Sequence, residues 1–264
     1  MTGDGRGRGT SDGRGAKRHA IVVGASSGFG AATGAALRRS RWIVTGISRR
    51  PAAQGSADQT LSCDVTDPAA LQGALDQAET SQGPARALVW CAGTPVMGRT
   101  LEVPVAAARE AFETTFWAMQ TAVRAVVPGM VTRGQGAVLV VLSIAALRAV
   151  PHEAYYGAAK AAAARWLECL AHEVEPQGVA VKLLYPGFVD TGFLERGGWW
   201  GMASPPHVRG SGVAVDDVAR AACELLEGRG SRRVLGWRER AIVLGDRVAP
   251  GLYDRVLRLR GRRG

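Results

Sequence analysis

Short apolar segments alternate along the chain with longer, alanine-rich segments. The short segments have the length of buried strands, and the longer ones have the composition and periodicity of helices. This alternation predicts an α/β protein in which a parallel sheet is covered by helices on both faces. The expected strands are 19–24, 42–47, 59–63, 86–90, 136–142, 179–185 and 233–235. The expected helices are 29–40, 67–79, 104–131, 152–175 and 214–227.

The length and composition are those of one substantial domain. The 264 residues are 47% hydrophobic, and no internal repeat or interdomain linker interrupts the pattern. We expect the domain to span 19–250, with a tail at 1–18 and a separate segment at 251–264. No stretch approaches the roughly 20 apolar residues of a membrane span, and the N-terminus lacks the apolar centre of a signal peptide. We therefore expect a cytoplasmic protein.

The net charge of +10 is concentrated at the two ends of the chain. Residues 1–18 hold five Lys or Arg against two acids, residues 229–264 hold eleven against three, and residues 19–228 hold 17 against 18. Because the domain itself is almost neutral, no nucleic-acid partner is expected; a nucleic-acid or membrane-surface binder working through its basic ends is the alternative. Residues 1–18 have too few apolar side chains to offset chain entropy, so we expect them to be disordered.

The C-terminal segment combines apolar and basic residues at helical spacing. Leu252, Val256 and Leu259 recur on one side of a helix. The arginines between them are Arg255, Arg258 and Arg260. Packing of this segment on the domain or on a neighbouring subunit is the preferred interpretation, and contact with a lipid surface is the alternative.

The four cysteines form neither a C-x-x-C pair nor a set with metal-ligand spacing. We expect no metal site and no disulfide framework, and we interpret the cysteines as small buried side chains in a reducing compartment. They are Cys63, Cys91, Cys169 and Cys223.

A glycine cluster, Gly24-Ala25-Ser26-Ser27-Gly28-Phe29-Gly30, lies between an expected strand and an alanine-rich helix. Glycines permit positive φ and close approach of a ligand to the backbone. The unpaired N–H groups and the dipole of the following helix favour a phosphate group at this turn. The cluster therefore predicts a site for a dinucleotide pyrophosphate, although its G-x3-G-x-G spacing differs from the commoner G-x-G-x-x-G.

Further landmarks follow the glycine cluster in a fixed order. They are Asp64-Val65, Cys91-Ala92-Gly93, Ser143, Tyr156 with Lys160, and Pro186-Gly187 leading to Thr191. In this order they resemble the classical short-chain dehydrogenase/reductase family, from about His19 to Thr191. The resemblance implies a single-domain, Rossmann-type doubly wound parallel sheet and a nicotinamide-dependent oxidoreductase. It also implies a homodimer or homotetramer that pairs through the helices at 104–131 and 152–175.

The resemblance assigns the proton chemistry to Ser143, Tyr156 and Lys160. An unperturbed phenol has a pKa of about 10, so a nearby cation is needed to favour the phenolate at neutral pH. Lys160 lies one helical turn from Tyr156 and is expected to supply that charge, while Ser143 stabilises the substrate oxygen. Thr115 stands where the family has a catalytic Asn, which we expect to weaken the proton relay. A catalytically weakened dinucleotide-binding protein, acting as a redox sensor or scaffold, is therefore the alternative.

The cofactor preference is expected at the end of the second strand. Ser48 replaces the acid that would bind the ribose hydroxyls, and Arg49 and Arg50 can pair with a 2′-phosphate, so NADP(H) is favoured over NAD(H). Solvent-exposed arginines are the alternative. Asp64 resembles the adenine-contacting Asp of the family, and a turn-forming Asp is its alternative. The resemblance assigns these residues to the cofactor: Gly24, Ser26, Ser27, Gly28, Phe29, Gly30, Ser48, Arg49, Arg50, Asp64, Val65, Cys91, Ala92, Gly93, Tyr156, Lys160, Pro186, Gly187, Val189 and Thr191.

The segment 187–213 is expected to form a lid over the substrate. Large apolar residues stand there beside glycines, which suggests a mobile flap over a medium-sized apolar ketone, aldehyde or alcohol; packing against the C-terminal segment or a second subunit is the alternative. These residues are Phe188, Phe193, Leu194, Trp199, Trp200 and Met202, followed by Ser204-Pro205-Pro206. Leu147, Val150 and His152 are expected to form the opposite wall, with His152 at the surface or at a helix start rather than acting as an acid.

Overall fold

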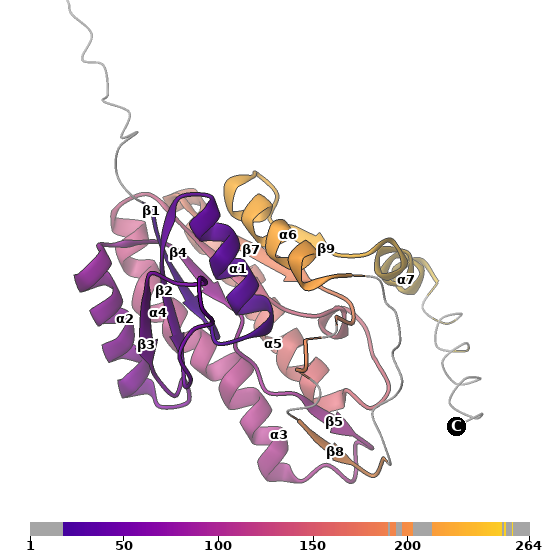
Figure 1. Cartoon of the computed structure of the whole chain (residues 1–264). Coiled ribbons are helices and arrows are strands. Elements are labelled where there is room, and N and C mark those ends of the chain that lie inside the picture. Colours follow the sequence, from indigo (N-terminus) through magenta and orange to yellow (C-terminus); the bar gives the residue numbers. More distant parts are fainter. Residues whose placement is uncertain are drawn as a thin grey trace, which may run out of the picture.

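The computed structural model describes residues 18–189, 191–193, 197–202, 213–249, 251 and 255. Seven parallel strands form one twisted sheet in the order β3-β2-β1-β4-β6-β7-β9 (Figure 1). The strands are β1 (Arg18–Val23), β2 (Trp42–Ser48), β3 (Gln59–Ser62), β4 (Ala85–Trp90), β6 (Gly136–Val141), β7 (Val179–Tyr185) and β9 (Arg232–Val234). The order reverses direction between β1 and β4, and at such a reversal the carboxyl ends of parallel strands leave a crevice.

Helices cover both faces of the sheet, as predicted (Figure 1). Ile21 and Val23 of β1 pack into a core with α2, α4 and α5, whereas Ala20 and Val22 pack into a second core with α1 and α6. Burial on both faces explains why the strands are continuous apolar runs. The helices are α1 (Gly28–Arg39), α2 (Pro68–Gln82), α3 (Val105–Phe112), α4 (Ala118–Thr132), α5 (Ala154–Val174), α6 (Val215–Glu227) and α7 (Trp237–Val248), with short 3-10 helices η2 (Ile144–Ala146) and η3 (Glu175–Gln177).

The single helix expected at 104–131 is wrong in one respect. A π-helical turn, η1 (Glu113–Trp117), separates α3 from α4. The sequence contains no Gly or Pro at this turn, so local patterns do not mark it. The extra residue of a π turn re-aims the side chains around it, and here Thr115 is buried.

Two short strands, β5 (Val96–Gly98) and β8 (Gly198–Trp200), and the helix α7 were not expected. The two strands pair in parallel and tie the middle of the expected lid to the segment after β4. The Trp200 side chain packs against a buried cluster of Val96, Val103, Ala108 and Ala111, which we call the α3 cluster. Trp200 therefore contacts the α3 region of its own domain, and the role of 187–213 as a lid stays a prediction.

Several boundaries differ from expectation, and several predictions fall on residues that the structure does not describe. Strand β1 begins at Arg18, whose guanidinium lies 3.2 Å from the Glu227 carboxylate and 4.5 Å from the centre of the Trp42 ring. The tail 1–17 lies outside the described residues. So do Leu194, Ser204-Pro205-Pro206, Leu252, Val256, Leu259, Arg258 and Arg260.

The four cysteines differ in exposure. All four cysteines are free; Cys63 is buried, but Cys169 is exposed, so the expectation that all four are buried is wrong. Cys169 lies on an outward position of α5. Within the described ranges, no helix has the length and apolar character needed to cross a bilayer.

Candidate active site

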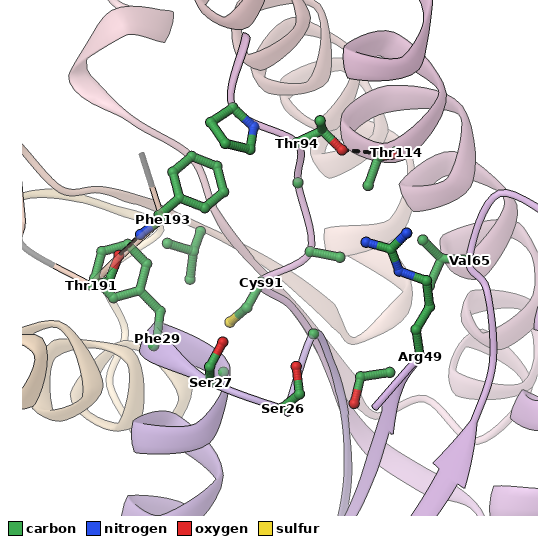
Figure 2. A pocket seen from close by; sticks show the side chains of 18 of the residues that line it. Ser26, Ser27, Phe29, Arg49, Val65, Cys91, Thr94, Thr114, Thr191 and Phe193 are labelled. Atoms are coloured by element: carbon green, nitrogen blue, oxygen red, sulfur yellow. Dashed lines mark hydrogen bonds between the residues drawn. The ribbon is translucent and has the colours of Figure 1, made fainter. Parts of the chain in front are cut away.

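A cavity of about 730 Å³ opens at the carboxyl ends of the strands (Figure 2). Its lining includes every residue that the sequence assigned to the cofactor except Pro186. The glycine turn follows β1, Ser48 ends β2, and Cys91 follows β4, so strand order alone brings these distant segments together. Pro186 lies next to the lining, where its carbonyl accepts a hydrogen bond from Ile144 N at 3.0 Å.

The glycine turn is closed so tightly that side chains cannot enter it. Gly24 has φ of +89° and Gly28 has φ of +55°, in the left-handed region that favours glycine. A Cβ atom on Gly30 would overlap the carbonyl of Gly24. Helix α1 begins at Gly28 with no acid in its first turn, so its first N–H groups and its dipole can receive an anion. This cradle fits a phosphate group.

Basic side chains stand at the end of β2. The Ser48 hydroxyl donates to the Arg50 carbonyl at 2.6 Å, which closes the turn, and both Arg49 and Arg50 line the cavity with exposed side chains. Figure 2 shows the Arg49 side chain beside Val65. The cavity wall at this point therefore carries positive charge.

Asp64 fits both interpretations made from the sequence. Its Oδ1 accepts hydrogen bonds from Thr66 N at 3.0 Å and Thr66 Oγ1 at 2.8 Å, and these bonds lower the pKa of Asp64, with a further contribution from Arg49. The same residue lines the cavity. Asp64 therefore both forms a turn and lines the cavity.

Lys160 is buried on the cavity side of α5. Its Nζ donates to the Val141 carbonyl at 2.8 Å and lies 5.9 Å from the centre of the Tyr156 ring. Burial lowers the pKa of Lys160 to about 8, and Cys91 acts in the opposite direction. Lys160 is therefore a cation near neutral pH but titrates in the mildly alkaline range.

Tyr156 departs from the expectation that Lys160 would lower its pKa. Burial raises the pKa of Tyr156 and the Glu153 carboxylate raises it further, whereas a hydrogen bond with Ser143 lowers it. Burial also raises the pKa of Glu153 to about 7, opposed by Arg148. Desolvation and Glu153 together raise the pKa of Tyr156 by more than the Ser143 hydrogen bond lowers it. The Tyr156 hydroxyl therefore keeps its proton throughout the neutral range.

Ser143 follows β6 and lies within hydrogen-bonding reach of Tyr156. Its Oγ accepts a hydrogen bond from Ala145 N at 3.1 Å, which leaves the hydroxyl proton for Tyr156 or for a ligand. The chain brings Ser143, Tyr156 and Lys160 together from two elements, as the spacing predicted.

Thr115 reaches the same site from the π turn. Its Oγ1 and Lys160 Nζ lie 3.5 and 3.6 Å from the position that a Cβ on Gly93 would occupy. The Thr115 hydroxyl is buried and has no hydrogen-bond partner among the described residues. A side chain at position 93 would separate Thr115 from Lys160, and glycine keeps the space between them open.

Some lining residues were not named from the sequence. The Thr94 hydroxyl donates to Thr114 Oγ1 at 3.1 Å on one wall of the cavity (Figure 2). Adjacency was the available signal, because Thr94 follows Gly93 and Thr114 precedes Thr115. The remaining unexpected lining residues are Cys63, Thr66, Pro95, Glu110, Val141 and Leu142.

The two expected substrate walls have different outcomes. The lid residue Phe193 lines the cavity, and its ring centre is 5.9 Å from that of Tyr156 at an interplanar angle of 55°. Leu147, Val150 and His152 are not among the described lining residues, so the opposite wall stays a prediction. Leu147 packs toward the main core instead, and exposed His152 uses its carbonyl to accept from Gly98 N at 2.8 Å.

Comparisons with known proteins agree with this geometry. The family model for short chain dehydrogenase matches residues 18–198. A 3-ketodihydrosphingosine reductase of Bacteroides thetaiotaomicron is 31% identical over 67% of this chain, and the match spans 65% of that protein's length. A 1-deoxy-11-beta-hydroxypentalenate dehydrogenase of Streptomyces exfoliatus is 32% identical over 79% of each chain.

A solved structure shares this fold. The short chain dehydrogenase from Burkholderia cenocepacia J2315, determined in complex with NADP, superposes with a TM-score of 0.75 at 28% identity, covering 91% of this chain and 98% of that one. The seven-stranded parallel sheet and the matched residues lead to one assignment. The chain belongs to the short-chain dehydrogenase family and is an oxidoreductase that acts on CH–OH or C=O groups.

Proposed function

We propose that the protein uses NADP(H) to reduce the carbonyl of a medium-sized apolar ketone or aldehyde, or to oxidise the corresponding alcohol. The observation that carries the proposal is a single cavity with a glycine cradle and arginines in one part of its wall and Tyr156, Lys160 and Phe193 in another. The names of the relatives include both a reductase and a dehydrogenase, which supports chemistry in either direction.

The residues present fit a dinucleotide phosphate. The pyrophosphate would lie at the N-terminus of α1, where the turn has no room for side chains. A 2′-phosphate would pair with the guanidinium of Arg49 through charge-assisted hydrogen bonds. The NADP complex of the Burkholderia protein supports this assignment. When bound, the nicotinamide supplies or accepts the hydride.

The chain's own groups handle the proton. In the reductive direction the Tyr156 hydroxyl donates its proton to the carbonyl oxygen, and its raised pKa keeps that proton available at neutral pH. Lys160, held by Val141 O, stabilises the phenolate that forms. The Ser143 hydroxyl donates to the same oxygen and stabilises its developing charge.

The cavity near Tyr156 favours an apolar substrate. The Phe193 ring lies beside the Tyr156 ring, with 5.9 Å between the ring centres, and Val189 and Leu142 add further apolar lining. Such a wall excludes water from the reacting atoms and gains free energy from apolar contact.

Tyr156→Phe tests the catalytic assignment. Loss of the proton donor lowers kcat by about 10²- to 10⁴-fold, whereas NADPH affinity stays within about twofold because the ring remains. NADPH fluorescence titration, followed by the loss of nicotinamide absorbance with a panel of apolar ketones and aldehydes, measures both quantities. Tyr155→Phe is the matched control, since that ring packs beside the α3 cluster outside the cavity. Unchanged turnover in Tyr156→Phe removes Tyr156 as the acid.

Arg49→Asp tests the cofactor preference. The variant loses charge-assisted bonds worth about 1.5–3 kcal/mol, which corresponds to roughly a 10- to 150-fold weaker affinity for NADPH, while NADH affinity holds or improves. Titration of both dinucleotides gives the ratio. Arg124→Asp on the exposed side of α4 makes the same charge change away from the cavity and serves as the control. A ratio that does not move contradicts the 2′-phosphate assignment.

Thr115 favours a second candidate, a dinucleotide-binding redox sensor or scaffold with weakened catalysis. Its short, buried hydroxyl stands beside Lys160 without a partner among the described residues. Tight NADPH binding without consumption of any carbonyl in the panel would support this candidate over the reductase.

A further inference from the structure

Helix α7 follows the edge strand β9 and lies at the margin of the molecule (Figure 1). Glu239 and Val243 are its buried residues. The Glu239 side chain packs against two glycines: a Cβ on Gly187 would lie 2.5 Å from Glu239 Cγ, and one on Gly236 would lie 2.7 Å from Glu239 Cδ. These contacts hold α7 in one orientation, so its opposite face is fixed toward the outside.

The outward face of α7 is apolar. Trp237, Leu244 and Val248 are 75%, 62% and 76% exposed, and their spacing of seven and four residues places them on one side of the helix. The exposed residue Ala241 lies between them on the same side. We call these four residues the α7 stripe. A contiguous exposed stripe of this kind, including a tryptophan, marks an interaction surface.

The charges beside the α7 stripe are positive. Arg238, Arg240 and Arg247 are exposed on its two flanks, with the Arg238 guanidinium 5.3 Å from the centre of the Trp237 ring and Arg240 Nε also donating to the Val234 carbonyl at 2.9 Å. The two acids of the helix point elsewhere. Glu239 is buried, and Asp246 acts on Arg148, where it opposes the burial that lowers the pKa of Arg148.

An apolar stripe flanked by arginines on both sides favours one kind of binding partner over others. A second copy of the chain would bring arginines against arginines, because the stripe is flanked by the same sign on both sides. A nucleic acid offers phosphates but no apolar layer for Trp237, Leu244 and Val248. An anionic bilayer offers both, with phosphate groups for the arginines and an acyl boundary for the stripe.

We propose that the α7 stripe docks on the surface of an anionic phospholipid bilayer. The sequence after α7 is also basic: it holds one acid, Asp254, and five arginines, which are Arg255, Arg258, Arg260, Arg262 and Arg263. Because Glu239 packs against Gly187, which lines the active-site cavity, docking places α7 between the lipid surface and that wall of the cavity.

Flotation of the full chain with vesicles tests the proposal. The protein floats with vesicles of phosphatidylglycerol mixed with phosphatidylcholine, stays behind with pure phosphatidylcholine, and is released by high salt. The double variant Trp237→Ser/Leu244→Ser binds the mixed vesicles at least about tenfold more weakly. Leu101→Ser is the matched control, since Leu101 is 99% exposed but precedes α3 rather than lying on α7.

The folded state of each variant is checked by thermal unfolding, and exposed positions leave the midpoint unchanged. Equal binding to neutral vesicles, or equal loss in Leu101→Ser, overturns the proposal. Light scattering separates the competing occupant: a wild-type oligomer that dissociates in the double variant, together with no flotation, assigns the stripe to a second copy. These readouts do not use turnover, so they stand apart from the proposed reductase activity.

Discussion

Replacement of Gly30 by alanine places a methyl group inside the glycine turn. The new Cβ would lie 2.7 Å from the carbonyl carbon of Gly24 and 3.2 Å from Ala25 Cα, and closer still to the oxygen of Gly24. All of these are backbone atoms, which cannot rotate away as a flexible side chain can. The turn must therefore open by roughly 1 Å to restore ordinary contact.

The magnitude follows from two opposing effects. Overpacking against backbone atoms falls at the upper end of the usual range, about 2–3 kcal/mol, and the helix propensity of alanine returns about 1 kcal/mol, so Gly30→Ala lowers the free energy of unfolding by roughly 1–2 kcal/mol. For a chain of this size the unfolding midpoint falls by about 2–8 °C. Displacement of the N–H groups at the start of α1 also weakens NADPH binding by at least about tenfold.

Gly73→Ala is the matched control for this prediction. Gly73 is exposed in α2, and nothing lies within 4 Å of the Cβ that alanine would add. That variant gains about 0.5–1 kcal/mol of stability and binds NADPH like the parent. Circular dichroism during heating and fluorescence titration measure both proteins. A Gly30→Ala protein with the parent's midpoint and affinity would refute the description of this turn as a closed phosphate cradle.

Two further predictions concern proton transfer. Thr115→Asn adds an amide beside Lys160 and raises kcat for carbonyl reduction by roughly threefold or more; an unchanged kcat in stopped-flow or steady-state NADPH consumption shows that the hydroxyl already suffices. The lowered pKa of Lys160, about 8, predicts a pH dependence: Lys160 is charged below this value, so kcat/KM for reduction is highest there and falls as pH rises through it. A profile that stays flat from neutral to clearly alkaline pH contradicts the role of that charge.

Local patterns predicted the repeating part of the fold well. Buried parallel strands are continuous apolar runs, so β1, β2, β4, β6 and β7 were predicted to within about a residue at each end. The same runs imply the sheet, and strand ends imply the edge where the site lies. Most of the lining was therefore predicted as well, because it directly follows those strands.

Non-local contacts account for what was missed. Strands β5 and β8 are three residues each and exist only because segments about 100 residues apart pair with one another. Helix α7 was not predicted, although Trp237, Leu244 and Val248 recur at helical spacing; it buries only Glu239 and Val243, so this apolar side faces outward rather than into the core. Leu147 packs against the main core, a contact that the local pattern around it does not reveal.

The sequence by itself determined the order of strands and helices, the glycine turn, and the one-turn separation of Tyr156 and Lys160, because each depends on neighbours within a few residues. Only the tertiary structure decided the charge states of that pair. Burial by other elements raises the pKa of Tyr156 and lowers that of Lys160, and desolvation is a property of the surroundings rather than of the motif. The π turn that brings Thr115 to Lys160 and the outward direction of the α7 stripe were decided at the same level, since both depend on what packs against the opposite face.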